Sequence, residues 1–110
     1  MTTALPRSKP HKYRAESTIV DGIRFASKKE AKRYSELLLL MKARKIIELE
    51  LQPRFRIEVN GHNVCTYVAD FRYRDARGEI VEDVKGVRTP LYRLKRKLAE
   101  PQYGIKIVEI

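Results

Sequence analysis

A chain of 110 residues is long enough for one domain with its own core and too short for two. Hydrophobic residues make up 43% of it, which argues against disorder of the whole chain. There are 24 lysines and arginines against 14 acids, a net charge of +10, which favours a polyanionic partner such as nucleic acid. The chain has no apolar run long enough to cross a bilayer, and its single cysteine, Cys65, cannot form an internal disulfide. We therefore expect a cytoplasmic protein without a membrane partner.

The N-terminal segment is basic, and a small hairpin follows it. Residues 1–15 contain no acid, which predicts a flexible basic arm before a single domain at residues 16–110. Two interpretations of this arm stay open: it is a solvated tail, or it is an extension that binds phosphates through Lys12 and Arg14. Residues 18–25 predict a hairpin that turns at Asp21-Gly22.

A helix is predicted from Lys28 to about Ala43. Ser27 is its N-cap, and Glu30 stands three residues later, where a capping box places its acid. The apolar positions recur at helical spacing: Ala31, Tyr34, Leu37, Leu38 and Met41. Glu30 falls in the same angular sector, so we expect it on the stripe that faces a sheet, although a capping box would use its side chain locally.

Three strands, a second helix and a last strand complete the predicted order. The strands are Ile46–Val59 with a bend at Gln52-Pro53, Val64–Tyr73, and Glu79–Lys85, with turns at Asn60-Gly61 and 75–78. Thr89-Pro90 opens a helix to about Ala99 with Leu91, Leu94 and Leu98 inward, Pro101 to Gly104 stops it, and Ile105–Ile110 is the last strand. Because the second helix can act as a crossover, we expect an α/β fold: a mixed sheet of four to five strands flanked by two helices, in the order αβββαβ.

Two acids and a lysine on successive strands indicate the chemistry. Asp83 and Lys85 share one face of the third strand, and the turn at 75–78 brings Asp70 to a similar depth on the neighbouring strand. With Glu30, three carboxylates would converge and raise one another's pKa values, a cost that a divalent cation removes. Such oxygen ligands suit Mg²⁺ or Mn²⁺. The pattern therefore predicts in-line hydrolysis of a phosphodiester, with Lys85 orienting the attacking water and stabilising the developing negative charge.

This pattern resembles the PD-(D/E)XK nuclease superfamily, whose core has the same order of elements, over residues 27–110. Three segments carry the similarity, which extends to a small phage-encoded branch of formerly unknown function: Phe25–Ala31, Tyr67–Phe71 and Glu82–Gly86. One departure is Ala69, where the superfamily often has proline. The resemblance implies that Asp70, Asp83, Glu30 and Lys85 are catalytic, that the three acids bind the metal, and that the Val84 carbonyl adds a ligand.

The resemblance also implies a DNA endonuclease that leaves 5′-phosphate and 3′-hydroxyl ends. Related branches include Holliday-junction-resolving enzymes and the endonuclease subunit of a transposase. A chain this small has little room for a module that reads DNA sequence. We therefore expect a homodimer that selects branched or junction DNA in phage replication or recombination.

Basic residues around the second helix are predicted to contact DNA phosphates: Arg88, Arg93, Lys95, Arg96 and Lys97. Two other functions stay open, a non-catalytic nucleic-acid-binding protein derived from a nuclease, and an RNA-binding protein of ribosomal type. Two histidines and one cysteine argue against a zinc finger or a histidine–metal nuclease. The chain also lacks a glycine-rich phosphate loop and a nucleophilic serine motif.

Overall fold

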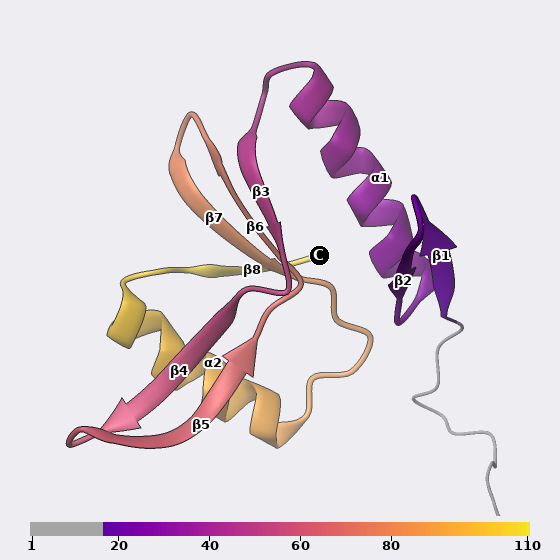
Figure 1. The fold of residues 1–110 in the computed structure, drawn as a ribbon. Coiled ribbons are helices and arrows are strands. Elements are labelled where there is room, and N and C mark those ends of the chain that lie inside the picture. The colour runs from indigo at the N-terminus through magenta and orange to yellow at the C-terminus, as the bar shows by residue number, and fades with distance from the viewer. Residues whose placement is uncertain (1–16) are drawn as a thin grey trace, which may run out of the picture.

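The computed structural model describes residues 17–110 (Figure 1). The elements are, in chain order, β1 Thr18–Val20, β2 Ile23–Phe25, α1 Lys28–Lys42, β3 Ile47–Leu51, β4 Arg54–Val59, β5 His62–Val68, β6 Phe71–Asp75, β7 Gly78–Asp83, α2 Pro90–Tyr103 and β8 Ile107–Glu109. The predicted arm, with Lys12 and Arg14, lies outside the described residues. The α/β class with two helices and a mixed sheet is confirmed.

The main sheet has four strands in the order β3-β6-β7-β8. Its first three strands pair antiparallel, while β8 pairs parallel to β7. Parallel neighbours need a long connection, and α2 supplies it, as the sequence predicts. This arrangement puts the end of β7 beside the end of β8.

The long hairpin before β7 kinks in its middle, so each of its two predicted strands splits in two. Gln52 takes a left-handed backbone with φ of +51°, and Pro53 follows it. The break on the opposite strand faces this one: the Gln52 N–H donates to the Asp70 carbonyl at 2.9 Å, and the Ala69 N–H donates to the Pro53 carbonyl at 3.1 Å. Beyond the kink, β4 and β5 leave the main sheet as a separate two-stranded ribbon (Figure 1). The sequence predicts the bend at Gln52-Pro53 but not the matching break at Asp70.

Two hydrophobic clusters share the interior. On one face of the main sheet, Phe71 and Tyr73 of β6 pack with α1 and the β1–β2 hairpin. A second cluster joins Val81 of β7 and Ile107 of β8 to α2 and to the β4–β5 ribbon. Figure 1 shows the same division, with α1 on one side of the main sheet and α2 lying along the ribbon. Alternation along β7 therefore decides which cluster each of its side chains joins.

Both helices begin where the sequence predicts. The Ser27 hydroxyl accepts from the Glu30 N–H, and the Thr89 hydroxyl accepts from the Tyr92 N–H, each at 3.1 Å. The predicted stripe of α1 is buried through Leu37, but Met41 near its end is 37% exposed. In the described part of the chain, neither helix is long and apolar enough to cross a membrane.

The second helix differs from its prediction in length and in its buried face. It continues through Pro101 to Tyr103 and ends at Gly104, whose φ of +64° is the left-handed conformation that glycine adopts easily. Leu91 and Leu94, predicted to face inward, are 59% and 54% exposed. The residues that α2 buries instead are Tyr92 and Ala99, on a helical stripe one residue further along the chain.

Candidate active site

The kink and the end of β7 bring the three predicted acids together. Asp70 lies at the kink between β5 and β6, Asp83 ends β7, and Glu30 lies in the first turn of α1. The Val84 N–H donates to the Asp70 carboxylate at 2.6 Å, which fixes that side chain. The Glu30 carboxyl interacts with that of Asp70, and the Asp70 carboxyl with that of Asp83. Glu30 is 7% exposed, so it does not point into bulk solvent.

Burial and mutual repulsion perturb these carboxyl groups. Burial is the main cause that raises the pKa of Asp70 to about 8; the Val84 N–H opposes the shift, and Asp83 and Glu30 add to it. The pKa of Glu30 is also raised, first by burial and then by the charge of Asp83, while Asp70 and Lys85 act against the rise. At neutral pH without a cation, the cluster therefore keeps protons that exposed acids would release.

Asp83 is the most buried of the three acids, and two side chains hold it in place. It is 1% exposed, its Oδ2 accepts from the Tyr67 hydroxyl, and its Oδ1 lies 3.3 Å from the Lys85 ammonium. The Lys85 ammonium also lies 4.3 Å from the ring centroid of Tyr92. The sequence predicts Lys85 at the end of a strand, but β7 ends at Asp83 and Lys85 lies beyond it. Its ammonium group still reaches Asp83. Tyr67 is buried, and sequence reasoning missed the contact of its hydroxyl with Asp83.

A pocket of about 530 Å³ opens over this cluster. Its lining contains the predicted residues Glu30, Asp70, Val84 and Lys85, together with Ala26, Ser27, Lys29, Gly86 and Val87. We call this the acid pocket; Asp83 is not among its lining residues. Within residues 17–110, no three acid, imidazole or thiol groups are already arranged around a common point that could hold a metal. The donor chemistry, carboxylates beside a backbone carbonyl, nevertheless fits Mg²⁺ or Mn²⁺.

A second buried acid lies on the other face of β7. Glu82 is 1% exposed, and its two oxygens accept from Arg33 of α1, at 2.8 Å from Nε and 2.5 Å from Nη2. The Tyr73 hydroxyl also donates to Glu82. The sequence places Glu82 on the opposite face from Asp83 correctly but does not reveal these partners. Because Arg33 lies one turn after Glu30, this pair ties the start of α1 to the strand that carries Asp83.

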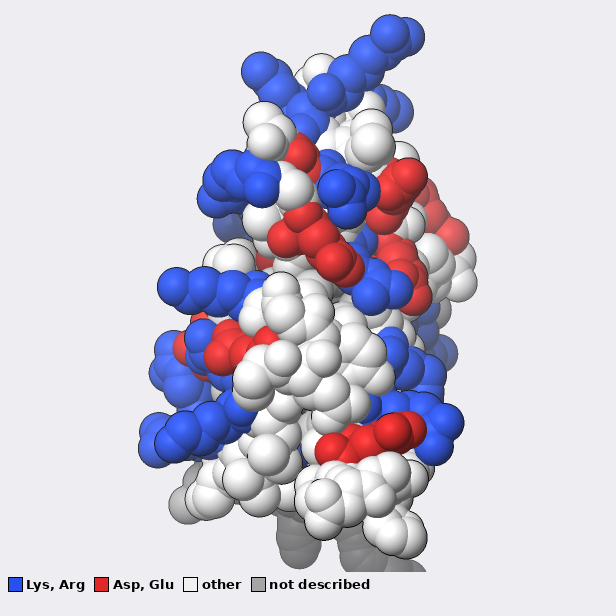
Figure 2. All heavy atoms as spheres, turned by 90° about the vertical axis from the view of Figure 1, so that its left-hand side faces the viewer, with Lys and Arg blue, Asp and Glu red and all other residues white. Residues whose placement is uncertain are grey.

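The predicted DNA-contacting residues in and just before α2 fall into two groups. Arg88 and Arg96 both bind Glu109 of β8, at 2.6 and 2.8 Å, so their guanidinium groups are already engaged. Arg93 and Lys97 are exposed and Lys95 is half-buried, and none of these three forms an ion pair within residues 17–110. On the face seen in Figure 2, basic side chains surround an uncharged centre, with acids among them. The positive charge is therefore not a continuous patch on that face.

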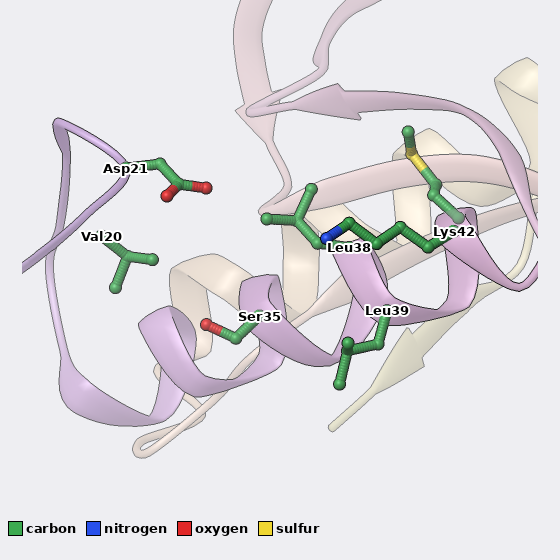
Figure 3. Close-up of a pocket in the computed structure, with 7 residues that line it drawn as sticks. Val20, Asp21, Ser35, Leu38, Leu39 and Lys42 are labelled. Atoms are coloured by element: carbon green, nitrogen blue, oxygen red, sulfur yellow. The ribbon is translucent and has the colours of Figure 1, made fainter.

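Another pocket, of about 700 Å³, lies between the β1–β2 hairpin and the C-terminal part of α1. In Figure 3, Val20 and Asp21 extend from the hairpin side, while Ser35, Leu38, Leu39 and Lys42 come from the helix. Its lining is mainly apolar and includes none of the predicted site residues. This pocket shares no lining residue with the acid pocket.

A family model described as "Protein of unknown function (DUF1064)" matches residues 10–108. Since the match spans nearly the whole chain, the chain belongs to this family. No curated protein and no solved structure matches the chain. The family description names no activity, so the functional argument depends on the fold and on the side chains around the acid pocket.

Proposed function

We propose that this DUF1064 family member is a divalent-metal-dependent nuclease that hydrolyses DNA phosphodiester bonds. The observation that carries the proposal is the contact of Glu30, Asp70 and Asp83, which come from three separate elements, beside the Lys85 ammonium. Burying acids against one another is unfavourable unless something offsets their repulsion. A protein that only binds polyanions through its net charge of +10 would gain nothing from such a cluster.

The order of elements supports the resemblance to PD-(D/E)XK nucleases. Helix α1 precedes three antiparallel neighbours, β3, β6 and β7, and α2 then leads to β8, which is parallel to β7. If β1–β2 and β4–β5 are taken as additions, these elements fit the order αβββαβ that the resemblance implies. The resemblance implies a first acid on the second core strand and an acid-x-lysine motif on the third. Asp70 directly precedes the second of these core strands, and Asp83 ends the third.

Glu30 and Asp70 in the acid pocket, together with the more buried Asp83 and the Val84 carbonyl, would hold Mg²⁺ or Mn²⁺. When bound, such a cation polarises a phosphate and lowers the pKa of an attacking water. The protein keeps the ligands in place: the Val84 N–H holds Asp70, while the Tyr67 hydroxyl and the Lys85 ammonium hold Asp83. A cluster that keeps protons at neutral pH would release them as the cation enters.

Lys85 has the second role in the proposed hydrolysis. Its side chain lines the acid pocket, where an ammonium can orient the water and stabilise negative charge that develops on the phosphate oxygens. The water oxygen forms a bond to phosphorus as the P–O bond to the leaving oxygen breaks. The water loses one proton and the leaving oxygen takes up one, so the reaction releases no net proton at this step. By the resemblance, the leaving oxygen is O3′, which leaves 5′-phosphate and 3′-hydroxyl ends.

Cleavage of labelled DNA tests this proposal. A four-way junction, a flap, a nicked duplex and a single strand are incubated with Mg²⁺, Mn²⁺ or EDTA. We expect metal-dependent cutting, with the branched substrates preferred if the protein acts as a homodimer on junctions. Asp70→Asn and Lys85→Ala should abolish cutting, whereas Lys106→Ala removes an exposed charge outside the acid pocket and should not. Cutting in EDTA, or full activity of Lys85→Ala, would contradict the mechanism.

One observation favours a second candidate, a non-catalytic nucleic-acid-binding protein that descends from a nuclease. Within residues 17–110 the three acids are not already spread around a common centre, and Asp83 does not line the acid pocket. This candidate predicts DNA binding that is the same with Mg²⁺ and with EDTA, and no cutting of any substrate.

A further inference from the structure

A smaller pocket, different from the two already described, adjoins the acid pocket at Lys85. It has a volume of about 250 Å³ and lies between β5 and the start of α2. Its lining residues are Thr66, Tyr67, Val68, Lys85, Thr89, Leu91, Tyr92 and Lys95, and we call it the side pocket. Lys85 lines both pockets, so a ligand whose phosphate lies at the Lys85 ammonium can extend into either one.

The rim of the side pocket is apolar on a strongly charged protein. Val68 is 40% exposed and Leu91 is 59% exposed, in a chain of which 35% of the residues are charged. Leu91 is one of the leucines that the helical pattern places inward, and it lies instead at this opening. Thr66 and Thr89 add hydroxyl groups to the lining. Apolar walls with a few polar groups suit a flat heterocycle and its sugar.

Two ammonium groups belong to the lining of this pocket. Lys85 stands on the side of the acids, and Lys95 lies one turn after Leu91 on the same face of α2. Lys95 is half-buried and forms no ion pair within residues 17–110. A nucleotide inside a strand has a phosphate on each side of its sugar. Two cations and apolar side chains in one pocket are complementary to a nucleoside and the two phosphates beside it.

We propose that the side pocket holds the base and sugar of the nucleotide next to the scissile phosphate, and that Lys95 binds the following phosphate. The proposal rests on the proposed function, because that function places the scissile phosphate at Lys85. A base that is paired and stacked in a duplex must first be flipped out of the stack to enter a pocket in the protein, so a nucleotide that is already unpaired is preferred. The substrate class is therefore DNA with an unpaired nucleotide at the cleavage position: a single strand, a flap or an open branch point.

A binding experiment tests the side pocket independently of hydrolysis. Asp70→Asn protein in EDTA is titrated into a fluorescein-labelled thymidine decamer and into a duplex of equal length. We expect the single strand to bind at least about tenfold more tightly than the duplex. Leu91→Glu should remove this preference, while Leu94→Glu, which adds the same charge at a similarly exposed position of α2, should keep it. Lys95→Gln should lower the slope of log affinity against log salt by about 1, and Lys106→Gln should lower it less.

The outcomes separate the two proposals. Equal binding of single strand and duplex, or equal effects of Leu91→Glu and Leu94→Glu, would overturn the side pocket even if the protein cuts DNA. A preference for the single strand that only Leu91→Glu removes would support the side pocket even if no metal ion supports cutting. In that case the proposed hydrolysis would be wrong, and the side pocket would serve binding alone.

Discussion

Replacing Arg33 by leucine should lower the free energy of unfolding by about 3 kcal/mol. Glu82 is 1% exposed, and Arg33 donates two hydrogen bonds to its carboxylate. Removing one partner of a buried ion pair typically costs about 3 to 5 kcal/mol, because the other charge stays buried without compensation. The lower end applies here, since the Arg33 side chain is itself 21% exposed and the Tyr73 hydroxyl still donates to Glu82. For a domain of this size, the midpoint temperature of thermal unfolding should decrease by about 15 °C.

Urea denaturation of four proteins measures the effect. The double variant Arg33→Leu/Glu82→Leu should recover about half of the loss, with about 1 to 2 kcal/mol remaining for the Tyr73 hydroxyl that has lost its acceptor. Arg77→Leu is the control: its ion pair with Asp75 lies at an exposed turn, and we expect no measurable change. The claim is that Arg33 compensates the buried charge of Glu82. It would be refuted if Arg33→Leu lowered the free energy of unfolding by less than about 1 kcal/mol, or if the double variant were no more stable than Arg33→Leu.

Three further predictions follow from the same contacts. Without metal, the free energy of unfolding should fall as the pH rises from about 4 to about 8, because the raised pKa of Asp70 lets the folded state keep a proton that the unfolded chain releases. Denaturant unfolding at pH 5 and pH 8 measures this fall, and Asp70→Asn should reduce it. An equal fall in Asp70→Asn and in the parent protein would contradict the prediction. Ser27→Ala removes the acceptor for the Glu30 N–H and should cost about 1 kcal/mol in thermal unfolding, so an unchanged midpoint would argue against the cap. Arg93→Gln/Lys97→Gln should lower the slope of log affinity for DNA against log salt by about 2 in fluorescence anisotropy without a change in stability, and an unchanged slope would exclude these side chains from phosphate binding.

Features with a local cause could be predicted from the sequence. The turn at Asp21-Gly22 requires positive φ at both residues, and the structure has φ of +54° and +76° there. Ser27 and Thr89 cap their helices through their own hydroxyl groups. In each case the residues that determine the structure are neighbours in the chain, so a short pattern contains the information.

The kink at Asp70 could not be predicted in the same way, because its cause lies on the opposite strand. Val68 to Phe71 is apolar enough to suggest one continuous strand. It is Gln52 and Pro53 that bend the hairpin, and the hydrogen bonds across it carry the bend to Asp70. The wrong prediction for the buried face of α2 has a related origin. Apolar positions that include Leu91 and apolar positions that include Tyr92 both recur at helical spacing, and only packing against the β4–β5 ribbon selects the face with Tyr92.

The candidate site shows the same boundary between local and distant information. Strand alternation and helix spacing identify Asp83, Asp70 and Glu30 as acids that can meet. Tyr67 and Arg33 were missed as partners of acids because they lie 16 and 49 residues from Asp83 and Glu82. The residues that hold the acids thus become visible only when the strands are paired.

The central claim is that Glu30, Asp70 and Asp83 share one divalent cation, and calorimetric titration with MgCl₂ or MnCl₂ tests it most directly. We predict one saturable binding event near pH 7, accompanied by proton release because the raised pKa of Asp70 keeps that carboxyl protonated without metal. Asp70→Asn should abolish the event, while Glu79→Gln, which removes an exposed acid outside the acid pocket, should preserve it. Heats that never saturate, or that are the same for Asp70→Asn and the parent protein, would contradict the claim.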